Sequence, residues 1–313
     1  MSAPPALRLR GATLEPSPQR PLLMGIVNAT PDSFSERGET RTAEELCERA
    51  HELVAAGAGL IDVGGESGRT DRVAVSPEQE AARIVPVVER LAGEGAAVSV
   101  DTWRAPVARA ALAAGAALVN DPSGLSDLEV ASACAEAGAG LVVTHTRVAP
   151  KQKRFPAHGE LLADAPAFLG ERIKAAVERG VEPEGIVVDP GLDLGKTPAE
   201  SVELLRSLDV LAPLGRPILL AASRKDFIGA LTGGSPATRL AGTLAAVEAG
   251  LAGGASILRV HDVAETADYV RVRSALRGEA EVSADLRLDE SLRRENAERS
   301  EDDGRPENGE RAA

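Results

Sequence analysis

The stretch LLMGIVNATPDSFS at residues 22–35 changes character at Asn28, where an apolar run typical of a buried strand gives way to a small, polar loop. The same change recurs seven more times, and each run delivers polar side chains to the end of a strand. The later runs are IDVGGES at 61–67, VSVD at 98–101, LVND at 118–121, VVTH at 142–145, IVVDPG at 186–191, ILLAASRK at 218–225 and ILRVHD at 257–262. The sequence therefore predicts eight strands that end in chemically active groups.

Segments of helical length and pattern separate these strands. Residues 42–57, 76–95, 105–115 and 237–254 carry apolar residues three and four positions apart, and several of them end in Gly. Continuous Val, Ile and Leu strands are typical of a parallel sheet covered by helices on both faces. Eight strand–helix units predict a closed (β/α)8 TIM barrel, in which all eight strand ends meet at one mouth. A doubly wound open sheet is the less favoured alternative, because no G-x-G-x-x-G turn follows the first strand.

The composition is that of one globular domain. The chain has 313 residues, of which 43% are hydrophobic and only 2% aromatic, so Ala, Val and Leu must fill the core. We expect an N-terminal extension at 1–20, the barrel at 21–278 and an acidic, disordered tail at 279–313. No apolar stretch approaches the length of a membrane span, and the first 20 residues lack the pattern of a signal peptide. These features predict a cytoplasmic protein without a membrane partner, in which Cys47 and Cys134 are reduced and buried.

The charge distribution narrows the choice of partner. The net charge is −13, and −6 of it lies in residues 279–313, where a frayed helix around 286–299 is the most structure we expect. The remaining −7 argues against nucleic acid, which requires a basic surface. It leaves open an anionic small molecule held by cations inside one pocket.

The strand ends divide into two chemical sets. The first set combines carboxylates, an amide and an ammonium, which suits a flat heterocycle rich in ring nitrogens and amino groups. Its members are Asp101, Asn120, Asp189 and Lys225. The second set offers cations and neutral donors, and in it Arg259 and His261 lie two apart, as a clamp for a phosphate or diphosphate would. Its members are Asn28, Arg69, Ser223, Arg259 and His261.

Simpler interpretations exist for single residues. Asp101 and Asp189 could each cap the helix that follows them. His145 could support a neighbouring residue without touching a ligand, and Arg224 with Lys225 could form an ordinary solvated turn. The full set is harder to explain in this way, because eight independent strand ends rarely all become polar without a shared site.

These motifs together resemble the dihydropteroate synthase family. The resemblance runs in order from Leu22 to Val270. It rests on NATPDSFS at 28–35, IDVGGES at 61–67, SVDT at 99–102, ND at 120–121, DPG and GKT within 189–197, SRKDFIG at 223–229 and RVHD at 259–262. It implies transfer of a hydroxymethyl-dihydropterin from its diphosphate to para-aminobenzoate, giving dihydropteroate and diphosphate in folate biosynthesis.

The resemblance also implies residue roles. The first set would hold the pterin, with Asp101, Asp189 and Lys225 closest to the chemistry. Asn28 would lie with Mg²⁺ and the diphosphate, which Arg259 and His261 would bind. Arg69 would also contact substrate, and Ser223 would bind the aminobenzoate carboxylate. A homodimer is implied as well. No Ser, Cys or Lys is paired with a base as a covalent nucleophile, which fits departure of diphosphate before the amine attacks.

Thr70, Asp71 and Asp193 depart from the family pattern, which has Pro, Gly and Gly there, and so do four other positions. Gly68 replaces a Thr, Leu194 a Phe, Thr144 a Met and Ala221 a Gly. All four leave the charged and amide residues untouched, so pterin binding is the firmer expectation. Two interpretations follow: a working synthase with an altered aminobenzoate pocket, or a pterin-binding paralogue in which the transfer is lost or changed.

Two further functions are less favoured. A folate-dependent corrinoid methyltransferase would use the same barrel, but the NATPDSFS and RVHD motifs argue against it. A non-catalytic protein that scaffolds a folate enzyme through its acidic tail is the other.

Overall fold

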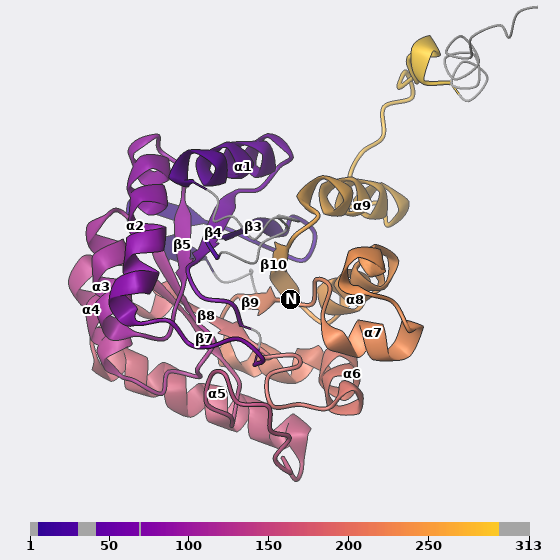
Figure 1. The fold of residues 1–313 in the computed structure, drawn as a ribbon. Coiled ribbons are helices and arrows are strands. Elements are labelled where there is room, and N and C mark those ends of the chain that lie inside the picture. The colour runs from indigo at the N-terminus through magenta and orange to yellow at the C-terminus, as the bar shows by residue number, and fades with distance from the viewer. Residues whose placement is uncertain (1–5, 31–41, 69, 294–313) are drawn as a thin grey trace, which may run out of the picture. The chain divides into compact units, whose positions relative to one another are not determined.

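The computed structural model describes residues 6–30, 42–68 and 70–293. It confirms the predicted (β/α)8 barrel, whose eight parallel strands close in the order β10-β3-β4-β5-β6-β7-β8-β9 (Figure 1). The strands of the barrel are β3 Leu22–Asn28, β4 Leu60–Gly64, β5 Val98–Asp101, β6 Leu118–Asp121, β7 Gly140–Thr144, β8 Ile186–Asp189, β9 Ile218–Leu220 and β10 Ala255–Val260. The open-sheet alternative is thereby excluded.

Helices follow the strands, and those within residues 43–252 cover the outside of the barrel (Figure 1). The helices are α1 Ala43–Ala55, α2 Pro77–Gly93, α3 Ala105–Ala113, α4 Glu129–Ala137, α5 Leu161–Glu178, α6 Pro198–Arg206, α7 Asp226–Thr232, α8 Leu240–Ala252 and α9 Val263–Leu276. Short 3₁₀ turns lie at Pro183–Gly185, Leu208–Leu214, Pro236–Thr238 and Glu290–Leu292. Capping boxes at Thr42, Ser76 and Thr197 fix where α1, α2 and α6 begin, because each side chain accepts a hydrogen bond from the third helical N–H.

The strand register arranges the barrel interior in layers. One layer is a buried apolar cluster that includes Met24, Leu60, Leu118, Val142, Val187, Leu219 and Ile257. Side chains two positions apart on a strand share a face, so the next layer toward the carboxyl ends holds the residues two positions further on. That layer contains Ile26, Asp62, Asn120, Thr144, Asp189, Ala221 and Arg259, so most of its members are polar. The polar layer thus lies directly above an apolar one.

The N-terminal segment is more structured than the predicted extension. Strands β1 Leu7–Leu9 and β2 Ala12–Leu14 form an antiparallel hairpin. Leu7 and Leu9 are buried in the apolar layer of the barrel interior, and a Cβ on Gly140, at the start of β7, would lie 3.0 Å from Leu9 Cδ2. The hairpin therefore closes the amino end of the barrel, and the opposite end is left for a ligand.

The structure also bears on the predictions about the cysteines, the division of the chain and membrane-spanning helices. Cys47 and Cys134 are buried and unpaired, as predicted. The chain divides into a unit at Met1–Val270 and a second at Arg271–Ala313, and within the second, residues 280–293 are exposed. The predicted disorder at 294–313 lies outside the described residues, and the boundaries at 20 and 278 stay predictions. Among the described helices, none combines the length and apolar character needed to cross a bilayer.

Loss of a buried side chain of the hairpin should destabilise the barrel. Leu7→Ala removes a fully buried side chain from the amino end, so we expect the free energy of unfolding to fall by about 2–5 kcal/mol. Urea titration followed by circular dichroism measures the change. The matched control is Leu231→Ala, because Leu231 is 70% exposed and its loss should cost about 0.5 kcal/mol or less. Equal effects of the two substitutions would contradict the role given to the hairpin.

Candidate active site

The structure gathers the polar strand ends at the carboxyl end of the barrel. The two predicted sets meet through Arg259, on β10. Its Nε donates to Asp62 Oδ2 at 2.6 Å and its Nη2 donates to Asp101 Oδ2 at 2.8 Å. Asn120 Nδ2 also donates to Asp62 Oδ2, at 3.1 Å. The guanidinium is therefore part of the same network as the residues of the first set.

Asp62 is a site residue that the sequence pattern did not reveal. Its side chain is fully buried within β4, whose neighbours Ile61 and Val63 are apolar. A signal was present, because a carboxylate inside an apolar strand requires a partner. However, Asp62 lies two residues before the end of its strand, and the pattern of polar strand ends does not extend to that position.

Burial opposes charge throughout this network. It raises the pKa of Asp101 to about 7, although Arg259 acts in the other direction. It also raises the pKa of Asp189, and Lys225 counteracts that rise. Burial by itself would lower the pKa of Arg259, but Asp62 and Asp101 outweigh it and raise that pKa above its ordinary value. The guanidinium is thus a permanent cation among carboxylates that need it.

Ser223 and His261 form a second group beside this network. The His261 backbone N–H donates to Ser223 Oγ at 3.2 Å, and that oxygen lies 3.0 Å from His261 Nδ1. Burial and the nearby Arg259 lower the pKa of His261 to about 4, so the ring is neutral at pH 7. The Ser223 hydroxyl then donates to Nδ1, which leaves the ring proton on Nε2, where it can be donated to an anion.

The turn after β9 positions Ser223 next to His261 and Lys225 next to the loop after β8. Arg224, between them, has φ +59°, a left-handed conformation that is uncommon for a residue other than glycine. Its guanidinium forms an ion pair with Asp262 through two nitrogens, and its backbone N–H donates to Thr243 Oγ1. The solvated-turn interpretation is therefore wrong for this pair: these contacts fix the turn.

Lys196 fixes the loop after β8 through hydrogen bonds to backbone carbonyls. This side chain is 1% exposed, and its Nζ donates to the carbonyls of His145 and Gly191 at 2.9 Å and of Leu194 at 3.4 Å. Burial lowers its pKa to about 7, but three carbonyl acceptors match the three donors of the ammonium form. Gly191 has φ +64°, and a Cβ there would lie 2.0 Å from the His145 carbonyl oxygen.

The same loop contacts both members of the predicted Asp189–Lys225 pair. Asp189 Oδ1 accepts a hydrogen bond from the Gly191 N–H at 2.6 Å, and Lys225 Nζ donates to the Leu192 carbonyl at 2.6 Å. The loop therefore fixes the positions of both charged groups. The role of Lys196 was also missed, because nothing in the local sequence indicates that a lysine is buried.

The helix-cap interpretations are wrong. Helix α3 begins at Ala105 with Arg104 as its N-cap, so Asp101 does not cap it. Asp189 binds its own loop, while Thr197 caps α6. His145 is buried, and its Nε2 lies 3.0 Å from Asp164 Oδ2, which fits a supporting role.

The remaining predicted residues are placed as follows. Asn28 ends β3, and in the register it lies opposite Gly64, which lies opposite Asp101. A Cβ on Gly64 would be 3.8 Å from Asn28 Oδ1 and 3.6 Å from the Asp101 Cβ. Asn28 and Asp101 therefore lie on either side of Gly64. Arg69 lies outside the described residues, as do residues 31–35 of the first motif.

Two of the departures from the family pattern fall in the barrel interior. Thr144 lies opposite Asp189 in the register and is buried. Ala221 packs against the apolar layer. By contrast, Gly68 is exposed, and a Cβ added there would meet no atom of the described residues within 4 Å. Leu194 is half-buried in the loop that Lys196 holds.

Removal of Asp62 should be costly. Asp62→Ala removes the carboxylate that accepts from Arg259 Nε and leaves part of a buried charge unpaired. We therefore expect the free energy of unfolding to fall by about 3–5 kcal/mol. The control is Glu136→Ala, which breaks an exposed pair with Arg109 and should cost about 1 kcal/mol or less. Urea titrations of both variants measure the difference. If the two losses are equal, Asp62 does not hold a buried charge.

Acid should destabilise the folded protein through His145. Burial and Lys196 lower its pKa to about 4 from 6.5, so between these values the unfolded chain binds a proton that the folded chain does not. The stability due to the neutral ring is complete above pH 6.5 and is lost as the pH falls toward 4. His145→Gln should therefore lower the slope of unfolding free energy against pH by up to about 1.4 kcal/mol per pH unit.

Urea titrations of both proteins in metal-free buffer, across that pH range, measure the two slopes. Burial raises the pKa values of Asp101 and Asp121, so these two groups change the slope in the opposite direction. Both proteins contain them, and subtracting one slope from the other removes their contribution. His51→Gln is the control, because His51 is an exposed histidine paired with Glu94. Identical slopes for wild type and His145→Gln would show that His145 titrates normally.

Comparison with known proteins assigns the family. The model of the family described as "Pterin binding enzyme" matches residues 24–261. A dihydropteroate synthase from Bacillus subtilis is 39% identical over 260 residues, which cover 82% of this chain and 89% of that protein. A Mycobacterium leprae relative named "Inactive dihydropteroate synthase 2" is 40% identical over 267 residues, covering 83% of this chain and 91% of that protein.

Solved structures agree with these relatives. The Xanthomonas albilineans dihydropteroate synthase with 4-aminobenzoic acid is 40% identical, covers 88% of this chain and 98% of its own, and superposes with a TM-score of 0.80. The same enzyme has been solved in complex with 7,8-dihydropteroate. With the barrel, its polar layer and these matches together, the chain belongs to the dihydropteroate synthase family of pterin-binding enzymes.

Proposed function

We propose that the protein is a dihydropteroate synthase, which condenses hydroxymethyl-dihydropterin diphosphate with para-aminobenzoate. The observation that carries this proposal is the network of Asp62, Arg259, Asp101 and Asn120, with Asp189 and Lys225 beside it. Carboxylates accept from the amino group and ring N–H of a pterin, while the amide and ammonium donate to its carbonyl and unprotonated nitrogens. Dihydropteroate bound to the Xanthomonas relative supports the same ligand class.

The charges of the site suit a dissociative transfer. The bond between the pterin methylene carbon and the diphosphate oxygen breaks first, and its electron pair leaves with diphosphate. Asp101 and Asp189 stabilise the methylene cation electrostatically. The arylamine nitrogen then attacks this carbon and transfers a proton to the diphosphate, which leaves as the second product. His261 donates from Nε2 to the leaving group, and Arg259 faces the same end of the barrel with a guanidinium already fixed by two carboxylates.

Asn28 is the residue we assign to Mg²⁺. Its amide oxygen is a hard ligand, and in the register Asn28 is separated from Asp101 only by Gly64. Mg²⁺ is commonly bound by one or two protein oxygens together with substrate phosphates, which matches one amide and a diphosphate. When bound, it would neutralise charge on the departing diphosphate. Homodimer formation and cytoplasmic location stay predictions.

A paralogue that binds pterin without the transfer is the second candidate. The departures Gly68, Leu194, Thr144 and Ala221 favour it, and identity does not separate the two, since a relative named inactive is as similar as one named a synthase. The synthase is preferred because none of the departures removes a carboxylate, amide or cation of the two sets.

Activity and binding measured together test the proposal. Purified protein is assayed for dihydropteroate formation from dihydropterin diphosphate, para-aminobenzoate and Mg²⁺, with calorimetric titration of the dihydropterin alongside. Turnover is the expected result. Tight pterin binding without turnover would instead identify the paralogue, and absence of both would overturn the pterin site.

Variants should separate the two substrates. Lys225→Ala and Asp101→Asn remove charge-assisted hydrogen bonds, so each should weaken dihydropterin binding about 10- to 100-fold. Gly68→Thr should mainly change the KM for para-aminobenzoate. Lys174→Ala is the control, because Lys174 is an exposed lysine on α5. Equal effects of the three site variants on both substrates would contradict the division into two subsites.

A further inference from the structure

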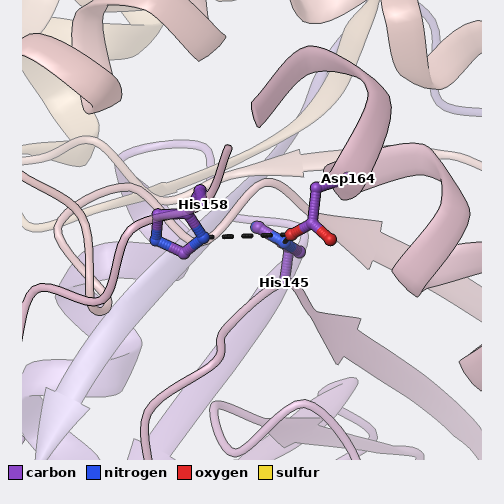
Figure 2. A group of neighbouring side chains, drawn as sticks. All are labelled: His145, His158 and Asp164. Atoms are coloured by element: carbon purple, nitrogen blue, oxygen red, sulfur yellow. Dashed lines mark hydrogen bonds and ion pairs between the residues drawn. The ribbon is translucent and has the colours of Figure 1, made fainter. Parts of the chain in front are cut away.

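Three metal-ligating side chains converge beside the active site, where no proposed catalytic step uses them. His145 follows β7, His158 lies in the connection to α5, and Asp164 is in the first turn of α5. Figure 2 shows the three side chains meeting. One ligand atom from each lies within 4.8 Å of the other two. The cluster joins three separate segments of the chain.

The distances are close to those of a metal site. His145 Nε2 lies 3.0 Å and His158 Nδ1 lies 3.8 Å from Asp164 Oδ2 (Figure 2). Tetrahedral coordination with metal–ligand bonds of about 2.0–2.1 Å places neighbouring ligand atoms about 3.3 Å apart. These two separations lie on either side of this value, and the two imidazole ligand atoms lie within 4.8 Å of each other. The side chains must therefore shift to complete a tetrahedral site.

The hydrogen bonds of His158 point to a ligand. Its side chain is 1% exposed, and its Nε2 lies 2.9 Å from the Gly195 carbonyl oxygen. A carbonyl can only accept, so Nε2 carries a proton, and in the neutral form of the ring Nδ1 presents a lone pair. Within the described structure this buried Nδ1 has no hydrogen-bond partner, and it faces Asp164. A ligand imidazole that donates its other N–H to a carbonyl is the usual arrangement at metal sites.

Two cations compete with a bound metal. Arg147 pairs with Asp164, with Nη2 at 2.5 Å from Oδ1 and Nε at 3.3 Å from Oδ2. Its side chain is 45% exposed and can turn toward solvent. The second cation is Lys196, whose charge would repel a metal ion. Its ammonium donates to three backbone carbonyls, one of which is that of His145, so it does not occupy the ligand atoms. The site therefore remains available, but with reduced affinity for a dication.

From this geometry we propose that His145, His158 and Asp164 bind Zn²⁺ or a similar divalent transition metal. Two neutral imidazoles and one carboxylate are ligands that suit Zn²⁺ rather than Mg²⁺. Through the hydrogen bond from His158 to Gly195, the metal would connect the segment after β7 to the loop that follows Asp189. Its role is structural: it fixes this loop relative to α5.

Metal titration of the full-length protein tests the proposal. After treatment with a chelator and dialysis, Co²⁺ is added and visible absorption recorded, and Zn²⁺ is then used to displace it. We expect one equivalent bound, with the intense absorption of tetrahedral cobalt. His158→Gln should weaken the Kd at least about tenfold, and His51→Gln, which changes an exposed histidine, should leave it unchanged.

Arg147→Gln supplies a test in the opposite direction. Removing the competing guanidinium should tighten the Kd by up to about fivefold. Zinc-edge X-ray absorption on the wild-type protein should show two imidazole ligands, and this measurement needs no variant. Neither result depends on catalysis, so failure of the proposed synthase activity would leave the metal test intact. The proposal is overturned if His158→Gln binds metal like the wild type, or if zinc shows no imidazole ligands.

Discussion

The buried guanidinium of Arg259 is the constraint on which the active end of the barrel depends. Carboxylates on β4 and β5 can lie at the carboxyl end of the barrel because a cation on β10 is bonded to both of them. Each ion alone would be expensive to bury, and only a paired arrangement is tolerated. The pair crosses from the last strand of the barrel to the second and third, so it forms only when the barrel closes. Folding and assembly of the candidate site are therefore one event.

Layering explains why this polar network lies where it does. The apolar cluster below it is completed by Leu7 and Leu9 from the N-terminal hairpin, which keeps water from the amino end of the barrel. The network then faces an apolar interior on one side and the open mouth on the other. Charged groups in such a place interact strongly with one another and with a ligand, because little water screens them.

The barrel and most of the site could be predicted from sequence because both follow a repeating pattern. Eight apolar runs with polar ends determine strand number, and the ends give Asp101, Asn120, Asp189 and Lys225. Features that depend on contacts between distant segments could not be found in this way. Asp62 can be recognised as a site residue only from its hydrogen bond with Arg259, almost 200 residues later in the chain. The hairpin strands are three residues each, too short for a pattern, and the burial of Lys196 depends on carbonyls of two separate loops.

Lys196 has a consequence for how this protein can diverge. Its ammonium fixes the backbone at 191 and 194 through carbonyl oxygens, which every residue type possesses. The side chain at position 194 can therefore change from aromatic to aliphatic without moving Asp189 or Lys225. The side of the site proposed for the second substrate can therefore vary in sequence without displacing the groups proposed to bind the heterocycle.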